Sequence, residues 1–232
     1  MARFISNLTQ AVATVALCAA VPFAYADTVN MTLTSAGNVV LGGVYVNPYT
    51  ANINGVSSKI ICDDFAAETW VNESWSANVT TIDQLGGTKW GSVYADATQR
   101  YNASAWLINR LLSAANATEL GQVSFAIWGV FTPSALNTLS TTDRNAAQGL
   151  INQAMGNTYA AGTFSNFAIF TPIAGSATNC GGGPCAAAPQ EFMGIRKVVR
   201  ADEASSTALL GLNLLALIGF GLLYRRRMVG LS

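Results

Sequence analysis

The residues of this chain that could do chemistry are its cysteines and carboxylates, because histidine is entirely absent from the 232 residues. Histidine is the commonest general base and the commonest zinc ligand, so its absence excludes Ser-His-Asp and Cys-His catalysis. We therefore expect neither a metal ion nor a cofactor, and we interpret the protein as non-enzymatic. Catalysis by two carboxylates stays open, and a carbohydrate-active enzyme is one alternative interpretation.

The carboxylates show no spacing that singles out a catalytic pair. The candidates are Asp63, Asp64, Glu68, Glu73, Asp83 and Asp96. The adjacent Asp63 and Asp64 could bind calcium, which prefers clustered carboxylates in exported domains. Adjacent aspartates also cap turns or pair with a nearby lysine or arginine, and that alternative remains open.

Two of the cysteines are predicted to form a disulfide. Cys180 and Cys185 enclose a short Gly-Gly-Gly-Pro segment, and glycine lets a chain fold back tightly. A loop this short constrains the chain only locally. Cys62 then has no partner in this pairing. It is expected to be a buried small hydrophobic residue or, in a different pairing, to join a disulfide with another cysteine.

The N-terminal residues 1–26 have the layout of a secretory signal peptide. Arg3 supplies a positive start, an apolar run follows over residues 11–20, and Ala24 and Ala26 form an A-x-A cleavage site. The apolar run is shorter than the ~20 residues that span a bilayer. We expect cleavage before Asp27, which leaves an exported domain over residues 27–200 in an oxidising compartment.

The C-terminal residues 205–224 are long and apolar enough to cross a membrane as one helix. Three arginines follow directly and are expected to stay on the cytoplasmic side, in a short basic tail over residues 225–232. The sequence therefore predicts a protein held in the membrane by its C-terminal end, with the domain outside the cytoplasm.

This end of the chain resembles the PEP-CTERM sorting signal of Gram-negative bacteria. The matching residues are Glu203, Ser205, Ser206, the Ala208–Leu212 run, Arg225, Arg226 and Arg227. Asp202 and Ala204 stand where the family has prolines, so residues 201–204 form a degenerate motif. The resemblance implies anchoring in the inner membrane, recognition by an exosortase-type transpeptidase, release to the cell surface or extracellular matrix, and association with exopolysaccharide.

Hydrophobic periodicity predicts an α+β domain with a β-rich N-terminal part, central helices and C-terminal strands, followed by the transmembrane helix. Predicted strands cover residues 39–46, 49–53, 58–62, 69–71, 75–82, 168–173 and 191–199. Helical stripes cover residues 101–112, 120–131 and 140–156. Asn54-Gly55 predicts a hairpin turn, and Ser140 with Asp143 predicts a helix N-cap.

Four segments of the domain resemble thioester domains of bacterial surface adhesins. They are Gly43–Tyr49, Cys62–Phe65, Ala105–Leu107 and Ala126–Trp128. In those adhesins a cysteine is cross-linked to a glutamine two residues before the Ala-Ile-Trp segment. Here Cys62 matches the cysteine, Ser124 occupies the glutamine position, and the nearest glutamine is Gln122. A covalent adhesin that uses Cys62 and Gln122 is thus a second alternative, although two residues differ by about 200° around a helix.

Composition limits the partners of the domain. The formal net charge is zero and 10% of residues are charged, so the basic surface that nucleic acid requires is absent. A polar, uncharged surface is compatible with carbohydrate. We therefore expect the membrane, a sorting enzyme and exopolysaccharide as partners, and no nucleic acid.

Overall fold

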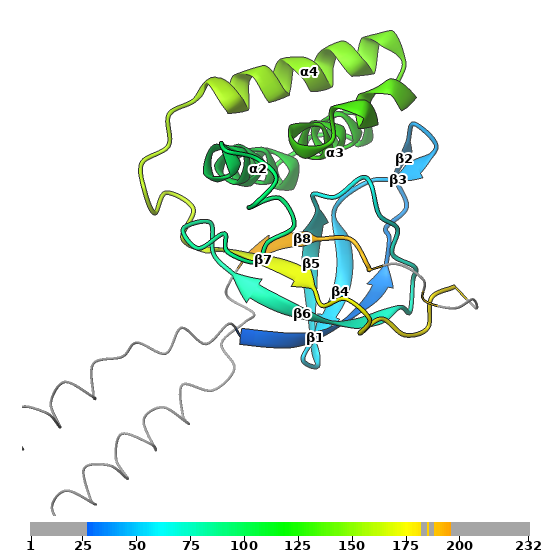
Figure 1. The fold of residues 1–232 in the computed structure, drawn as a ribbon. Helices are drawn as coiled ribbons and strands as arrows, with labels where there is room; N and C mark the ends of the chain where they lie inside the picture. The colour runs from blue at the N-terminus through cyan, green and yellow to red at the C-terminus, as the bar shows by residue number, and fades with distance from the viewer. Residues whose placement is uncertain (1–26, 182–184, 186–187, 196–232) are drawn as a thin grey trace, which may run out of the picture.

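The computed structural model describes residues 27–181, 185 and 188–195. Six antiparallel strands form a closed barrel in the order β1-β4-β5-β8-β7-β6 (Figure 1). The strands are β1 (Asp27–Ser35), β4 (Tyr49–Ile53), β5 (Val56–Cys62), β6 (Ser74–Thr80), β7 (Phe167–Pro172) and β8 (Phe192–Ile195). The described part is thus a mixed helix and strand domain, as expected. The strands before the helices and the strands after them belong to one barrel.

Strand β1 closes the barrel, because it pairs with β4 on one side and with β6 on the other. Val29, Met31 and Leu33 alternate with polar residues along this strand and are buried. A period of two places alternate side chains on the same face of a strand, so these three fill the barrel interior. Closure removes the free edges that would otherwise invite pairing with another chain.

The hairpin between β4 and β5 turns at Asn54-Gly55, as the sequence predicts. Both residues have positive φ, at 49° and 89°, and this combination is the type I′ geometry that suits a two-residue hairpin. The Asn52 side chain accepts a hydrogen bond from the Gly55 N–H at 2.6 Å. The turn therefore fixes the register of the β4–β5 pair.

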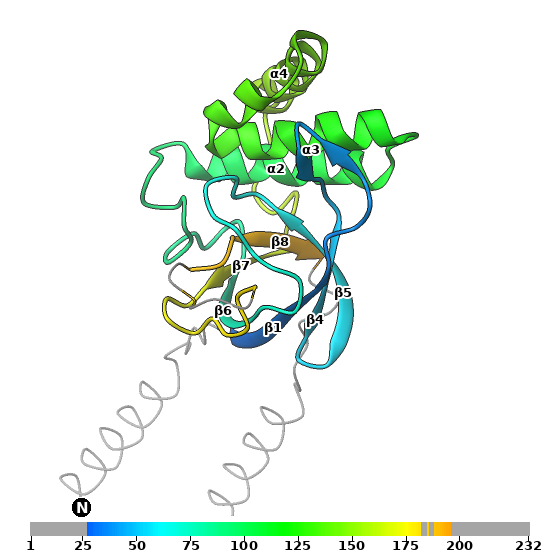
Figure 2. The same cartoon turned by 90° about the vertical axis from the view of Figure 1, so that its right-hand side faces the viewer.

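Three helices come between β6 and β7 in the chain and cover one side of the barrel. They are α2 (Ala97–Leu112), α3 (Ala117–Phe131) and α4 (Thr141–Gly156). Figures 1 and 2 show α2 and α3 next to the barrel and α4 as the outer layer. Ten of the fifteen residues of α3 are buried, as befits a helix enclosed on nearly all sides. The short 3₁₀ helix η1 (Pro133–Thr138) joins α3 to α4.

The helix ends follow local signals in the sequence. Asn116 and Ser140 accept hydrogen bonds from the N–H groups of Glu119 and Asp143, so each caps the start of its helix. Pro133 follows α3 after one residue, Thr132. The predicted cap at Ser140 is therefore confirmed.

Two strand predictions were wrong. Residues 39–46 form a small hairpin of β2 (Val40–Leu41) and β3 (Val44–Tyr45) instead of one strand, because Gly42 and Gly43 adopt positive φ and turn the chain. This hairpin leans against α3 (Figure 2). Residues 69–71 lie in a loop and the start of a turn instead of a strand. The predicted strand 191–199 is present as β8, and its residues 196–199 lie outside the described residues.

The predicted transmembrane helix at 205–224 also lies outside the described residues. Within the part of the chain that the structure describes, none of the helices combines the length and the apolar character needed to cross a bilayer.

Candidate functional site

The Cys62-Asp63-Asp64 segment lies at the end of β5, under the helical layer, and all three residues are fully buried. Asn47 holds its start: the Cys62 N–H donates to Asn47 Oδ1 at 2.7 Å, and Asn47 Nδ2 donates to the Cys62 carbonyl at 3.1 Å. The amide side chain thus stands in for a neighbouring strand and satisfies both backbone groups of Cys62.

Asp64 forms an ion pair with Lys89. Its Oδ1 also accepts the Ala66 N–H at 3.0 Å, and its backbone carbonyl accepts Gln190 Nε2 at 2.8 Å. A buried carboxylate is tolerable when paired and hydrogen-bonded in this way. Of the alternatives for the adjacent aspartates, this geometry matches pairing with a lysine and capping of a turn.

Glu191 is the second buried carboxyl group of the site, and it comes from the residue before β8. Tyr101 OH donates to its Oε1 at 2.5 Å, while the Lys89 N–H at 2.8 Å and the Thr171 hydroxyl donate to Oε2. Burial nevertheless raises the pKa of Glu191, because the charged form has lost its water. Burial also raises the pKa of Tyr101, so the phenol remains a hydrogen-bond donor to the carboxyl group.

Asp63 differs from its neighbours because neither carboxyl oxygen has a hydrogen-bond partner among the described residues. Burial, and then the charges of Glu191 and Asp64, raise the pKa of Asp63 well above its ordinary value. Both effects favour the neutral acid. The cluster of Asp63, Asp64 and Glu191, called the acid cluster below, therefore combines a paired carboxylate with two carboxyl groups whose pKa is raised.

The described residues contain no group of three or more cysteines or carboxylates placed to hold a metal ion. Asp64 is turned to Lys89, and Glu191 is occupied by hydroxyl and N–H donors. The groups around the Asp64 and Glu191 oxygens are an ammonium, hydroxyl groups and an N–H group. These groups donate hydrogen bonds and do not form a coordination shell for calcium.

Cys62 is the described cysteine outside a disulfide. Its thiol donates to the Asp64 carbonyl at 3.2 Å. Burial raises its pKa, and the charges of Asp63 and Asp64 raise it further, while the Asp64 N–H and then the adjacent Trp128 indole act in the opposite direction. A buried thiol with a raised pKa is chemically inert, so the structure matches the expectation of a small buried hydrophobic residue.

Gln122 and Cys62 are not brought together. Gln122 Nε2 donates to Asp143 Oδ1 on α4 at 3.0 Å, whereas the α3 side chain beside the thiol is Trp128. Six residues separate Gln122 from Trp128, which places them about 120° apart around the helix. Ser124, at the glutamine position of the adhesin pattern, is buried and donates to the Leu120 carbonyl at 2.9 Å.

A hollow of about 550 Å³ lies on the surface beside this cluster. Its walls are rich in aromatic side chains, namely Tyr45, Tyr49, Phe65, Trp70 and Trp128. Polar groups come from Glu68, Thr69 and Gln190. The volume lies within the range of small-molecule sites in proteins, and the mixture of apolar walls with few polar groups is typical of them. We call it the aromatic hollow.

Trp70 is fixed at the rim of the aromatic hollow by a tight turn. Its carbonyl accepts the Glu73 N–H at 2.9 Å, Asn72 has a φ of 74°, and Trp70 N–H donates to Glu73 Oε2 at 2.7 Å. Positive φ at the third position marks a type II turn. The indole packs against Gly181, where an added Cβ would lie 3.0 Å from the ring.

The remaining predicted site residues fall into two groups. Cys180 and Cys185 form a disulfide in the structure, and Asp27 is the first residue of β1. The signal-cleavage residues Ala24 and Ala26 lie outside the described residues, as do all residues of the sorting signal. Of the earlier carboxylate candidates, Glu68 lines the hollow, Glu73 holds Trp70, and Asp96 pairs with Arg100.

Sequence reasoning missed Glu191, Gln190 and Tyr45 as parts of a site. Glu191 was predicted only as a strand residue, and it lies 128 positions from Asp63, so no local spacing connects the two. Tyr45 had a usable signal, since it lies in the conspicuous Gly43–Tyr49 segment. Comparisons of the chain with protein-family models, with curated proteins and with solved structures found no match.

Proposed function

We propose that this chain is an exported, non-enzymatic protein of the cell surface or extracellular matrix, anchored by its C-terminal segment and associated with exopolysaccharide. One observation carries the proposal. Asp27, the first described residue, already lies in strand β1 and is paired with Val79 of β6. Asp27 is the residue that the signal-peptide pattern places first in the mature chain. Cleavage there would leave a strand that enters the barrel without a linker.

A second feature supports export. The disulfide between Cys180 and Cys185 is a bond that persists in oxidising compartments outside the cytoplasm. Removal of the tail by an exosortase-type transpeptidase, with release from the inner membrane, belongs to the same proposal and rests on the resemblance of residues 201–227.

The geometry favours neither alternative function. The covalent adhesin needs Cys62 next to Gln122, and Gln122 is bonded to Asp143 instead. The carbohydrate-active enzyme needs two carboxylates across an open cleft. Glu68 is the one carboxylate among the described residues that line the aromatic hollow, and the acid cluster is enclosed.

Intact-mass analysis of the protein from membrane and medium fractions of a producing cell tests this proposal. We expect a chain that begins at Asp27 and has lost two hydrogens for one disulfide, either anchored with its tail or released without it. A chain that keeps residues 1–26 and remains in the cytoplasm would refute export. Loss of one ammonia that disappears in Cys62→Ala would instead establish the thioester.

A further inference from the structure

We infer that the aromatic hollow is a binding site for neutral sugar units of a polysaccharide and that it faces away from the membrane. This inference rests on the proposed function and names its ligand class and its site. The first observation is the grouping of exposed hydrophobic residues. Tyr45, Trp70 and Val71 are 54%, 52% and 45% exposed, and all three line the hollow.

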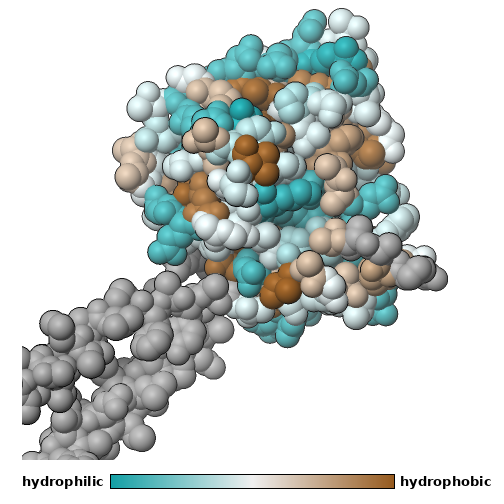
Figure 3. Space-filling model, viewed as in Figure 1, coloured by the Kyte–Doolittle hydropathy of each residue, from teal (hydrophilic) through white to brown (hydrophobic). Residues whose placement is uncertain are grey.

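Single exposed hydrophobic residues are normal on a protein surface, but three around one concavity are not. On the face of the molecule drawn in Figure 3, hydrophobic residues form small separate patches among hydrophilic ones. Below the rim, Tyr49 and Trp128 are buried and add two more aromatic side chains to the walls. Aromatic rings offer the C–H faces of a sugar a large apolar contact, while the polar ends of Tyr and Trp tolerate water.

The rim is held in place before any ligand arrives. Trp70 is fixed by its turn, by Glu73 and by the packing against Gly181. On the other side, Tyr49 OH donates to the Tyr45 carbonyl at 2.8 Å. A rigid site loses less conformational freedom on binding, which favours the weakly attractive contacts that a sugar makes.

The charge of the hollow selects against acidic glycans. Glu68 is the one charged side chain among its described lining residues, none of which is a lysine or an arginine. The nearby Lys89 is engaged by Asp64. A uronate carboxylate would meet like charge without a compensating cation, whereas a neutral sugar can hydrogen-bond to Glu68, Thr69 and Gln190.

A protein partner fits the hollow less well than a sugar chain. Stable protein interfaces bury about 800 Å² on each partner, which is far more than three exposed side chains at one rim supply. Concave shape, aromatic walls and few polar groups instead match a small cyclic ligand.

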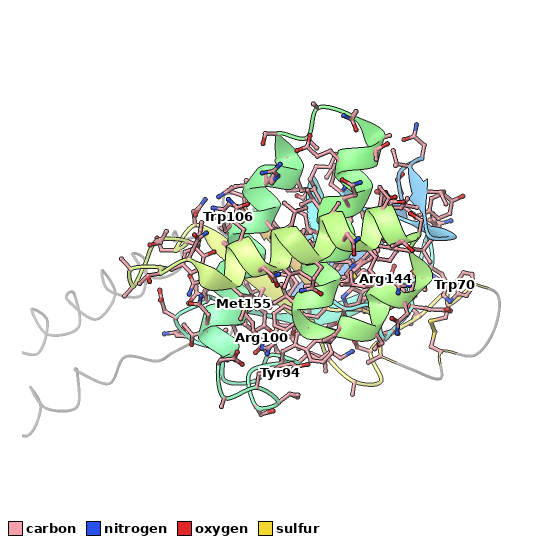
Figure 4. The ribbon with its side chains drawn as sticks, turned by 90° about the horizontal axis from the view of Figure 1, so that it is seen from above. Trp70, Tyr94, Arg100, Trp106, Arg144 and Met155 are labelled. Atoms are coloured by element: carbon pink, nitrogen blue, oxygen red, sulfur yellow. A yellow bond between two sulfur atoms is a disulfide. The ribbon has the colours of Figure 1, made fainter. Side chains whose placement is uncertain are left out.

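The strand directions place the hollow at the end of the barrel opposite Asp27 and Ile195, the outer residues of β1 and β8. Leu33, near the end of β1, lines the hollow, and it lies six residues or about 20 Å from Asp27. Gln190 also lines it, and β8 runs from there back to Ile195. In Figure 1, β1 begins and β8 ends on the left side of the barrel. Figure 4 shows Trp70 on the far side of the molecule from Trp106. A domain anchored beyond Ile195 therefore presents the hollow outward.

The test is binding of defined oligosaccharides to the full chain in detergent. The probes are neutral hexasaccharides (a glucan, a mannan and a chitin fragment) and a uronate hexasaccharide, measured by calorimetry and by tryptophan fluorescence. We expect a Kd between about 10 µM and 1 mM for at least one neutral probe and weaker binding of the uronate. Trp70→Ala should weaken binding at least about tenfold, while Trp70→Phe should retain most of it.

Two matched variants separate the ligand site from the fold. Val56→Ala removes an exposed hydrophobic side chain of the β4–β5 hairpin, outside the hollow, and should bind like the wild type. Glu68→Gln should raise affinity for the uronate by about three- to tenfold. Near-UV circular dichroism verifies that each variant is folded.

Three results would overturn the inference: no binding of any neutral probe at about 10 mM, binding unchanged in folded Trp70→Ala and Tyr45→Ala, or preference of the wild type for the uronate. These results would leave export untouched. Failure of export, with neutral sugar binding intact, would overturn the proposed function and the outward orientation of the hollow, but not its binding of neutral sugars.

Discussion

Asn47→Ala should be among the most destabilising substitutions in this domain, although it removes one small polar side chain. Asn47 is fully buried and satisfies both the N–H and the carbonyl of Cys62. Alanine would leave these two buried groups without partners, at about 1–3 kcal/mol each. The expected loss is therefore about 2–6 kcal/mol of the free energy of unfolding. For a domain of this size, that corresponds to a drop of about 4–24 °C in Tm.

Two further variants separate this cost from a general effect of losing an asparagine. Asn52→Ala removes the bond to the exposed Gly55 N–H, where water can replace the lost acceptor, and should cost about 1 kcal/mol or less. Asn47→Asp keeps the acceptor for the Cys62 N–H but sets a carboxylate oxygen against the Cys62 carbonyl. It should be nearly as harmful as alanine at neutral pH and should recover at acidic pH, when the protonated oxygen can donate.

The measurement is thermal unfolding of the full chain in detergent, followed by near-UV circular dichroism of the buried tryptophans. A Tm of Asn47→Ala no lower than that of Asn52→Ala would refute the argument that Asn47 replaces a strand at this point. An Asn47→Asp variant without pH dependence would refute the assignment of its Nδ2 as the donor to Cys62.

The remaining predictions concern the acid cluster and the helical layer. The pKa values of Asp63 and Glu191 are raised in the folded state, so their contribution to stability is present below the unfolded pKa of about 4 and is lost as pH rises through the folded pKa. Asp63→Asn should therefore gain stability relative to wild type as pH rises, by at most about 1.4 kcal/mol per pH unit, and a difference in Tm that is independent of pH would contradict this. Gly129→Ala should destabilise by about 1–3 kcal/mol, because its Cβ would lie 2.6 Å from Ile151 Cδ1. Gly149→Ala, in open space on α4, should stabilise by about 0.5–1 kcal/mol, and equal unfolding midpoints for the two variants would refute the close approach of α3 and α4.

Elements that depend on neighbouring residues could be predicted from the sequence. The turn at Asn54-Gly55 follows from the ease with which both residues adopt positive φ. The start of α4 follows from Ser140, whose hydroxyl accepts the Asp143 N–H three residues later. Each signal is complete within four residues, so no knowledge of the rest of the fold is needed.

Closure of the barrel could not be predicted in the same way. It depends on pairing β1 with β6 and β5 with β8, where Cys62 lies opposite Phe192, 130 positions away. Alternation within a strand shows which face is buried, but it does not identify the partner strand. The acid cluster was hidden for the same reason, since Asp63 and Glu191 meet only through the β5–β8 pair.

Gln190 connects the acid cluster to the aromatic hollow, and this connection explains how an enclosed group of carboxyls can support a surface site. Gln190 lines the hollow, donates through Nε2 to the Asp64 carbonyl, and donates through its N–H to the Thr69 hydroxyl, next to Trp70. Displacement of Asp64 would therefore shift the segment that carries the rim. Buried polar networks that are hydrogen-bonded rigidify their surroundings, so the ion pair of Asp64 with Lys89 helps to keep the wall of the hollow in position. The cluster then needs no access to solvent to matter for binding, and its effect on a ligand should come through the position of Trp70.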